Sequence, residues 1–209
     1  MIVDELTDTP DPARVTSSEL VFHGHVWDVR SDEFEYGGST LRRDYVDHTG
    51  AVAIIALDER DRVLLIKQYR HPIRTREWEP PAGLLDEPGE SPLHAAQREL
   101  SEEADLKADE WHVLSDYVTS PGGNNEVIRV FLARSLSPTG EAFAREGEEA
   151  DMELAWHPLE DVLDAVLASR VQNPSLVVGV LALDAARRRD WSTLRPADAP
   201  WPAFEDRRG

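Results

Sequence analysis

The sequence of 209 residues contains no cysteine. Disulfide bonds, thiolate nucleophiles and thiolate-ligated zinc sites are therefore excluded. The sequence also lacks an apolar run long enough to cross a bilayer. Its first residues, MIVDELTDTPDP, have neither the basic start nor the apolar core of a signal peptide. Together these absences predict a cytoplasmic protein with no membrane partner.

Basic residues are scarce as well. The chain has 22 lysines and arginines against 41 aspartates and glutamates, which gives a formal net charge of −19. Nucleic acid polymers bind proteins largely through lysine and arginine contacts with phosphates, so the sequence predicts no DNA or RNA partner. One local exception is the segment 67–76, which carries four basic residues and no acid.

Strand-like and helical patterns follow an acidic, proline-containing leader at residues 1–15. The pair Gly37-Gly38 favours a tight hairpin. Strands before and after a central helix indicate a mixed α/β sandwich, and the last residues are expected to form an irregular arm. The predicted strands are 21–36, 40–48, 51–57, 62–69, 111–119, 126–133 and 153–157, and the predicted helices are 91–106, 159–169 and 174–189.

The predicted helix 91–106 places three glutamates, Glu99, Glu102 and Glu103, on one face. The ordinary alternative is a solvated charged face, because glutamate is a good helix former. Arg98, however, is spaced to pair with Glu102, which leaves two carboxylates uncompensated. A divalent cation would compensate them, and hard oxygen ligands suit Mg²⁺ or Mn²⁺.

Residues 83–106 read GLLDEPGESPLHAAQRELSEEADL. This pattern resembles the Nudix box, Gly-x5-Glu-x7-Arg-Glu-apolar-x-Glu-Glu-x-Gly-apolar. There are two departures from it: six residues, not five, separate Gly83 from Glu90, and Asp105 stands where the box has glycine. A turn at Pro88-Gly89 would absorb the extra residue, and aspartate adopts the left-handed conformation more readily than most residues.

The resemblance implies a fold and a domain organisation. The expected fold is a Nudix-type α/β/α sandwich with a mixed sheet, preceded by an N-terminal antiparallel β subdomain. The expected parts are a flexible leader at 1–15, the β subdomain at 16–48, the catalytic domain at 49–190 and a C-terminal tail at 191–209. In similar pyrophosphatases the N-terminal strands exchange across a homodimer, so the resemblance also implies a homodimer.

The resemblance further implies a metal site. Glu99 and Glu103 would be metal ligands, with Glu102 a ligand or a catalytic residue beside them. The backbone carbonyl of Ala82, which precedes the box glycine, would be another ligand. Arg98 would orient the glutamates.

Two further segments resemble those of ADP-ribose pyrophosphatases: Gln68-Tyr69-Arg70, and the run from Trp78 to Gly83, WEPPAG. By this resemblance Arg70 contacts the diphosphate of the substrate and Glu79 lies at the ligand. Pro121, fifteen positions after Leu106 and followed by Gly122, also matches this group, although SPGG is in itself an ordinary turn.

The resemblance assigns two more residues to substrate binding. Arg43 matches an arginine that reaches the substrate in similar dimers. Trp27 resembles an aromatic residue that stacks on adenine, but a tryptophan on an alternating strand is more often part of the core. For the general base, the corresponding loop offers Glu148 and Glu149, and the sequence does not choose between them.

The predicted activity is divalent-metal-dependent hydrolysis of ADP-ribose to AMP and ribose 5-phosphate. The partner is accordingly a small nucleoside diphosphate substrate. One alternative is a Nudix hydrolase for another nucleoside diphosphate derivative, such as a sugar nucleotide. A non-catalytic nucleotide-binding regulator is a further alternative, but the three glutamates that such a protein could lose are all present.

Overall fold

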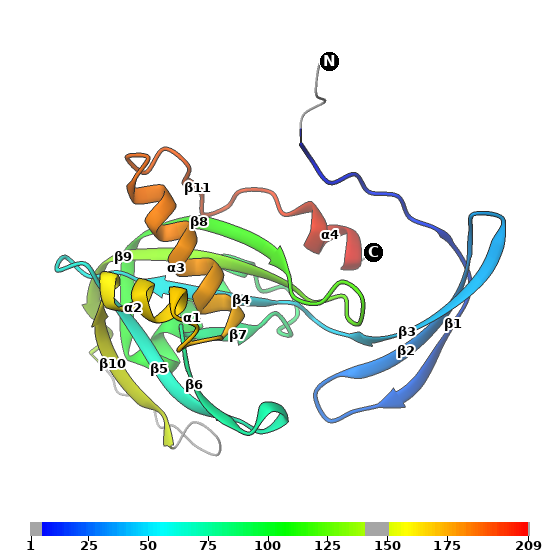
Figure 1. Cartoon of the computed structure of the whole chain (residues 1–209), viewed down its shortest axis with the longest axis horizontal. Coiled ribbons are helices and arrows are strands. Elements are labelled where there is room, and N and C mark those ends of the chain that lie inside the picture. Colours follow the sequence, from blue (N-terminus) through cyan, green and yellow to red (C-terminus); the bar gives the residue numbers. More distant parts are fainter. Residues whose placement is uncertain (1–5, 141–150, 209) are drawn as a thin grey trace. The chain divides into compact units, whose positions relative to one another are not determined.

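The computed structural model describes residues 6–140 and 151–208 (Figure 1). The described chain divides into two compact units. Unit 1 comprises the residues up to His48 together with Ser120–Asn125, and unit 2 comprises Thr49–Thr119 and the residues from Glu126 onward. Each unit has its own sheet structure.

Unit 1 is an antiparallel sheet of three strands in the order β1-β2-β3, with bounds Arg14–His23, Asp28–Tyr36 and Ser39–Asp47. The Gly37-Gly38 hairpin is confirmed, since both glycines have positive φ, 57° and 77°. The single strand predicted at 21–36 was wrong, because a turn at residues 24–27 divides it. Gly24 permits this turn, since a Cβ there would overlap the carbonyl of Trp27.

The loop Ser120–Asn125 belongs to unit 1 because it hydrogen-bonds to the end of β3. The backbone N–H of Val46 donates to the Gly123 carbonyl at 3.0 Å. Asn125 accepts from the His48 N–H at 2.8 Å and donates to Asp47 at 2.7 Å.

Unit 2 combines two sheets with helices, which confirms the predicted mixed α/β fold. One sheet has the order β11-β8-β9-β4-β7, in which β4 and β9 are parallel and the other pairs antiparallel; the second has the order β10-β5-β6. The strands are β4 (Ala51–Ala56), β5 (Arg62–Arg70), β6 (Thr75–Glu79), β7 (Ala82–Leu84), β8 (Leu106–Val118), β9 (Val127–Pro138), β10 (Glu153–Pro158) and β11 (Arg195–Pro196). The helices are α1 (Pro92–Ala104), α2 (Leu159–Leu167), α3 (Pro174–Arg187), α4 (Pro202–Arg208) and the 3-10 turn His71–Ile73.

The core of unit 2 has two layers, one on each face of β4. Ala53 and Ile55 pack in a cluster with residues of α2 and α3, the helices in front of the sheet in Figure 1. Val52 and Ile54, which alternate with them, pack in a cluster with α1. Because both faces of β4 are covered, its sequence is apolar throughout rather than alternating.

Two expectations about unit 2 were wrong. Two strands of unit 2, β4 and β5, were predicted ahead of the first long helix, but the described chain has four, because the short strands β6 and β7 flank Pro80-Pro81 and carry no periodic signal. The expectation that the last residues form an irregular arm was also wrong. Trp201 and Phe204 of the C-terminal segment are 4% and 7% exposed, and they stack on each other with ring centroids 4.9 Å apart.

The C-terminal segment is fastened to the sheet by Arg129 of β9, whose side chain is almost fully buried. Its guanidinium forms two hydrogen bonds with Asp116, at 2.8 and 3.0 Å. It also donates to the carbonyls of Ala199 at 2.6 Å and Pro200 at 3.1 Å, and it lies 4.7 Å from the ring centroid of Trp201. Among the helices of the described residues, none has the length and apolar character that crossing a membrane requires.

Candidate functional site

Helix α1 carries the predicted acidic site, and its two ends form as the sequence predicted. The Ser91 side chain caps the N-terminus by accepting a hydrogen bond from the His94 N–H at 3.3 Å, and Pro92 is the first helical residue. At the other end Asp105 has φ 54° and ψ 31°, the left-handed conformation for which the Nudix box uses glycine. Both ends of the helix are therefore fixed by local structure, at Ser91 and at Asp105.

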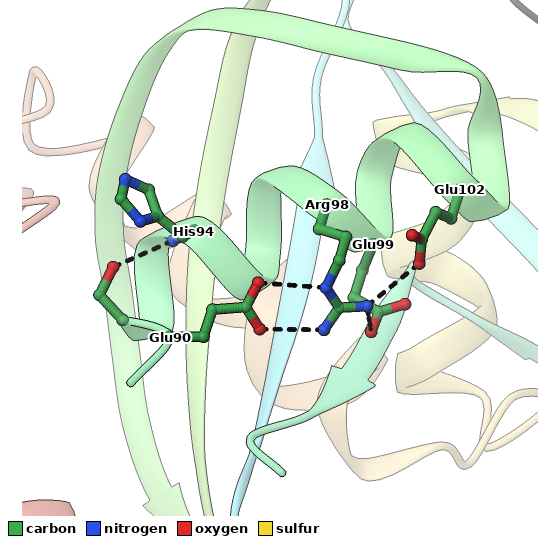
Figure 2. A network of polar contacts seen from close by, with 6 residues as sticks. Glu90, His94, Arg98, Glu99 and Glu102 are labelled. Carbon is green, nitrogen blue, oxygen red and sulfur yellow. Dashed lines mark hydrogen bonds and ion pairs between the residues drawn. The ribbon is translucent and has the colours of Figure 1, made fainter. Parts of the chain in front are cut away.

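Arg98 is the centre of a carboxylate network on α1 (Figure 2). Its Nε and Nη2 donate to the two oxygens of Glu90, each at 3.1 Å. Its Nη1 donates to Glu99 at 2.7 Å and to Glu102 at 3.0 Å. The hydrogen bonds to Glu90 are the main reason that the pKa of Arg98 is raised above its ordinary value. One guanidinium thus holds three carboxylates.

The extra residue ahead of Glu90 is absorbed in a turn. The Glu90 N–H donates to the Glu87 carbonyl at 3.2 Å, and Gly89 has φ 81°, which only glycine adopts without strain. Glu90 consequently reaches Arg98 despite the insertion.

Glu103 is bound to the backbone that precedes the helix. Its Oε2 accepts from the Ala82 N–H at 2.9 Å, and the residue is only 6% exposed. The Ile54 N–H donates to the Pro81 carbonyl at 2.8 Å, so in the antiparallel pair β4–β7 the polar groups of the next residue, Ala82, point away from β4. The Ala82 carbonyl therefore lies on the same side of β7 as its N–H, the side that faces Glu103.

Gly83 is required by the close approach of Glu99. A Cβ on Gly83 would overlap the carboxyl group and Cγ of Glu99, so only glycine leaves room for this side chain. Ala82 and Gly83 together thus position two of the helix glutamates.

The solvated-face alternative does not hold for Glu99 and Glu103. Glu103 is buried, the side chain of Glu99 is only 14% exposed, and that of Glu102 is 42% exposed. Within residues 6–140 and 151–208 no three acidic or histidine side chains already converge as a metal cage. The donor set nevertheless fits a divalent cation, because three carboxylates share a single guanidinium, and a fourth, Glu103, lies against Ala82, whose carbonyl faces it.

A second cluster lies on β5 and β6. Arg70 forms a two-pronged ion pair with Glu79, at 2.8 Å from Nε and 2.7 Å from Nη2. Glu79 is 2% exposed, whereas the side chain of Arg70 is 44% exposed. Glu77, which the sequence did not single out, lies beside them. Burial, followed by the charge of Glu79, raises the pKa of Glu77.

Four predicted substrate residues, Arg43, Trp27, Pro121 and Gly122, belong to unit 1. Trp27 does not belong to a core: it lies in the turn between β1 and β2, is 41% exposed and stacks on His48 with ring centroids 4.2 Å apart. Arg43 lies on β3 and donates to the Arg42 carbonyl at 2.7 Å. Their roles in substrate binding stay predictions.

Glu148 and Glu149 lie outside the residues that the structure describes. The choice of general base therefore stays a prediction between the two. Arg76 of β6 donates to the backbone carbonyl of Asp151, the first described residue after them, at 2.6 Å.

Comparison with known proteins places this geometry in context. The family model of the NUDIX domain matches residues 47–176. The chain is 41% identical to "ADP-ribose pyrophosphatase" of Mycobacterium tuberculosis, over 88% of this chain and 89% of that protein. It is 32% identical to "Methanol dehydrogenase activator" of Bacillus methanolicus, over 80% of this chain and 90% of that protein. A crystal structure of an ADP compounds hydrolase matches with a TM-score of 0.69 and 21% identity, covering 88% of this chain and all of the other.

Proposed function

The chain belongs to the Nudix family, and on that premise we propose that it hydrolyses the pyrophosphate of ADP-ribose to AMP and ribose 5-phosphate. The observation that carries this proposal is the 41% identity to an ADP-ribose pyrophosphatase over nearly the whole of both chains. The pair of Arg70 and Glu79 in unit 2 supports it, because a planar guanidinium suits diphosphate oxygens.

Nudix hydrolases generally need divalent metal ions, and we propose Mg²⁺, with Mn²⁺ as the alternative, for this chain. The residues that would hold the ion are Glu99, Glu102, Glu103 and the carbonyl of Ala82. When bound, the ion neutralises the diphosphate and lowers the pKa of a coordinated water. Arg98 keeps the helix carboxylates oriented, because Glu90, which lies before the helix, holds its guanidinium in place.

Substrate contacts are proposed for residues of both units. Arg70 binds the diphosphate, and Glu79 acts through Arg70 by holding its guanidinium flat and in place. In unit 1, Trp27 stacks on the adenine, which its exposed ring supports, and Arg43 binds a phosphate. Pro121 and Gly122 shape the substrate side of the loop, where their turn is closed by hydrogen bonds to Ser120 O.

The general base is proposed to be Glu148 or Glu149. Replacing each by glutamine separates them, since the loss of the base lowers kcat more than it raises KM. If neither change lowers kcat, the base lies elsewhere.

We also propose a homodimer in which unit 1 pairs with a second copy of the chain. Its support is the apolar surface of β1, where Val15, Leu20, Val21 and Phe22 are each more than half exposed. Patches of this kind typically mark interfaces. We further propose that residues 16–48 form a β subdomain and residues 49–190 the catalytic domain. The absence of cysteine supports a cytoplasmic location. Sedimentation that gives the monomer mass at micromolar concentration would contradict the dimer.

A substrate panel tests the activity. Purified protein with Mg²⁺ is incubated separately with ADP-ribose, a sugar nucleotide and NADH, and the products are identified. Release of AMP and ribose 5-phosphate from ADP-ribose is expected. Turnover of another member without ADP-ribose turnover would refute the substrate, and no turnover of any member would favour the regulator.

The variant Glu103→Gln tests the metal residues. An amide oxygen can still accept from the Ala82 N–H, so the fold is retained while a charged ligand is lost. Turnover is expected to vanish with an unchanged circular dichroism spectrum. Activity at the level of the unaltered protein would remove Glu103 from the metal site.

A further inference from the structure

A cavity of about 320 Å³ lies in unit 2 between the three-stranded sheet and helix α2. Residues of β5, β6 and β10 form one wall, and α2 with the loop after it forms the other. The lining residues are Leu65, Trp78, His157, Asp161, Val162, Ala165, Arg170 and Val171. This volume is at the lower end of the range for small-molecule sites.

The inner part of the cavity is apolar and aromatic. Leu65 and Val162 are buried, and the rings of Trp78 and His157 meet edge to face with centroids 4.9 Å apart at 75°. Apolar walls with a few polar groups are typical of sites for small ligands, and aromatic rings favour a planar partner.

His157 supplies a polar atom without a partner. Its Nε2 is buried and has no hydrogen-bond partner in the part of the chain that the structure describes. Buried side-chain polar atoms are hydrogen-bonded in the large majority of cases. A ligand with a donor or acceptor on its ring would complete this hydrogen bond.

The mouth of the cavity favours an anion. Among the lining residues Arg170, which is exposed, is the one base and Asp161 the one acid. Lys67, outside the lining, has its Nζ 5.2 Å from the ring centroid of Trp78. This local balance contrasts with the net charge of −19 for the whole chain. A planar guanidinium binds carboxylate and phosphate groups equally well.

From these observations we propose that the cavity is a second ligand site, for a small planar heteroaromatic ring that carries an anionic group. The ring packs against Trp78, a ring nitrogen or substituent pairs with His157 Nε2, and the anion lies at Arg170. The ligand is either a nucleoside monophosphate or an aromatic carboxylate, which share this chemistry.

This site is separate from the carboxylate cluster. Trp78 packs in the core cluster shared with α2 and α3, whereas α1 contributes to the other cluster. Trp78 and Glu79 are neighbours on β6, so their side chains point to opposite faces of the strand. The proposal therefore does not depend on the activity proposed above.

Nuclear magnetic resonance of protein with ¹⁵N-labelled histidine tests the proposal. The His157 signals are assigned by their loss in His157→Phe. Titration with AMP, nicotinate, adenosine and inorganic phosphate then separates the possible ligands. A saturable shift of the His157 Nε2 signal with AMP or with nicotinate is expected, and the stronger of the two identifies the source. Adenosine and phosphate, each lacking one half of the ligand, should bind more weakly.

Two variants of α2 provide the control. Ala165→Phe fills the cavity and should abolish the shift, whereas Leu167→Phe, at a position 73% exposed on the same helix, should leave it unchanged. The proposal is overturned if neither AMP nor nicotinate moves the signal, or if the shift survives Ala165→Phe. Should that variant fail to fold, Arg170→Gln replaces it, because Arg170 is exposed. Binding of the anionic probe should then weaken at least about threefold, and unchanged binding overturns the proposal.

Discussion

Replacing Gly83 by alanine tests how the site is built, because a single methyl group competes with Glu99 for the same space. The added Cβ would overlap the Glu99 carboxyl group and Cγ, so this side chain must move to another rotamer. The backbone of Gly83 does not have the positive φ that alanine would resist. The perturbation therefore falls on the glutamate and not on the strand.

The expected loss of stability follows from the contact that Glu99 loses. Its contact with Arg98, 2.7 Å long, is a partly exposed ion pair, and pairs of this kind contribute up to about 1 kcal/mol. For a chain of this size such a loss lowers Tm by about 2–4 °C. Catalysis should suffer more, since misplacing a functional group by about 1 Å can lower the rate roughly 100-fold.

The assay combines thermal unfolding, Mg²⁺ titration and ADP-ribose turnover for Gly83→Ala, Glu99→Gln and the double variant. Because both changes act on one side chain, the double variant should be little worse than Glu99→Gln alone. Gly123→Ala is the matched control for thermal unfolding and Mg²⁺ titration, since a Cβ there has its nearest neighbour at 3.9 Å. Full turnover and unaltered metal affinity in Gly83→Ala, or additive losses in the double variant, would refute the reasoning.

Three further predictions concern stability. Arg129→Met leaves Asp116 without its main partner in a buried setting, so we expect a loss of about 3 kcal/mol and a Tm lower by about 6–12 °C in a thermal melt. Asp105→Gly removes the strain of φ 54° and should raise stability by about 1 kcal/mol in urea unfolding. Burial raises the pKa of Tyr117 to about 12, so the folded state keeps this phenol neutral where the unfolded chain ionises. Stability that is complete below pH 10 should therefore decline between pH 10 and 12, and this decline should be smaller in Tyr117→Phe.

The sequence predicted the helix that carries the site because its signals are local. Ser91 and Pro92 begin α1, and the apolar positions at helical spacing, such as Leu100, are buried. The identities of the acids followed from the same spacing. In contrast, the contacts of Ala82 with Glu103 and of Gly83 with Glu99 join β7 to α1 and depend on the register of β7 against β4, which no local pattern specifies.

The packing of the C-terminal segment could not be predicted from the sequence for a related reason. The C-terminal segment has no periodic apolar pattern, so it was expected to be irregular, yet Trp201 and Phe204 complete the core on the α1 side. The signal that could have found it is the presence of two large aromatic residues in a short segment near the end of the chain. Their burial was not predictable without Arg129, because this arginine supplies the hydrogen bonds that the carbonyls of the segment require.

For the proposed metal site, the partners of the four acids predict which carboxylates bind a cation without refolding. Glu103 is held by a backbone N–H and Glu90 by a two-pronged bond to Arg98, so both contacts fix geometry. Glu99 and Glu102 share one nitrogen of that guanidinium, which neutralises them only in part. These two carboxylates therefore have the most to gain from an additional positive charge. The rigid part of the site is thus the strand–helix contact of Ala82 with Glu103, and its adjustable part is the shared nitrogen of Arg98.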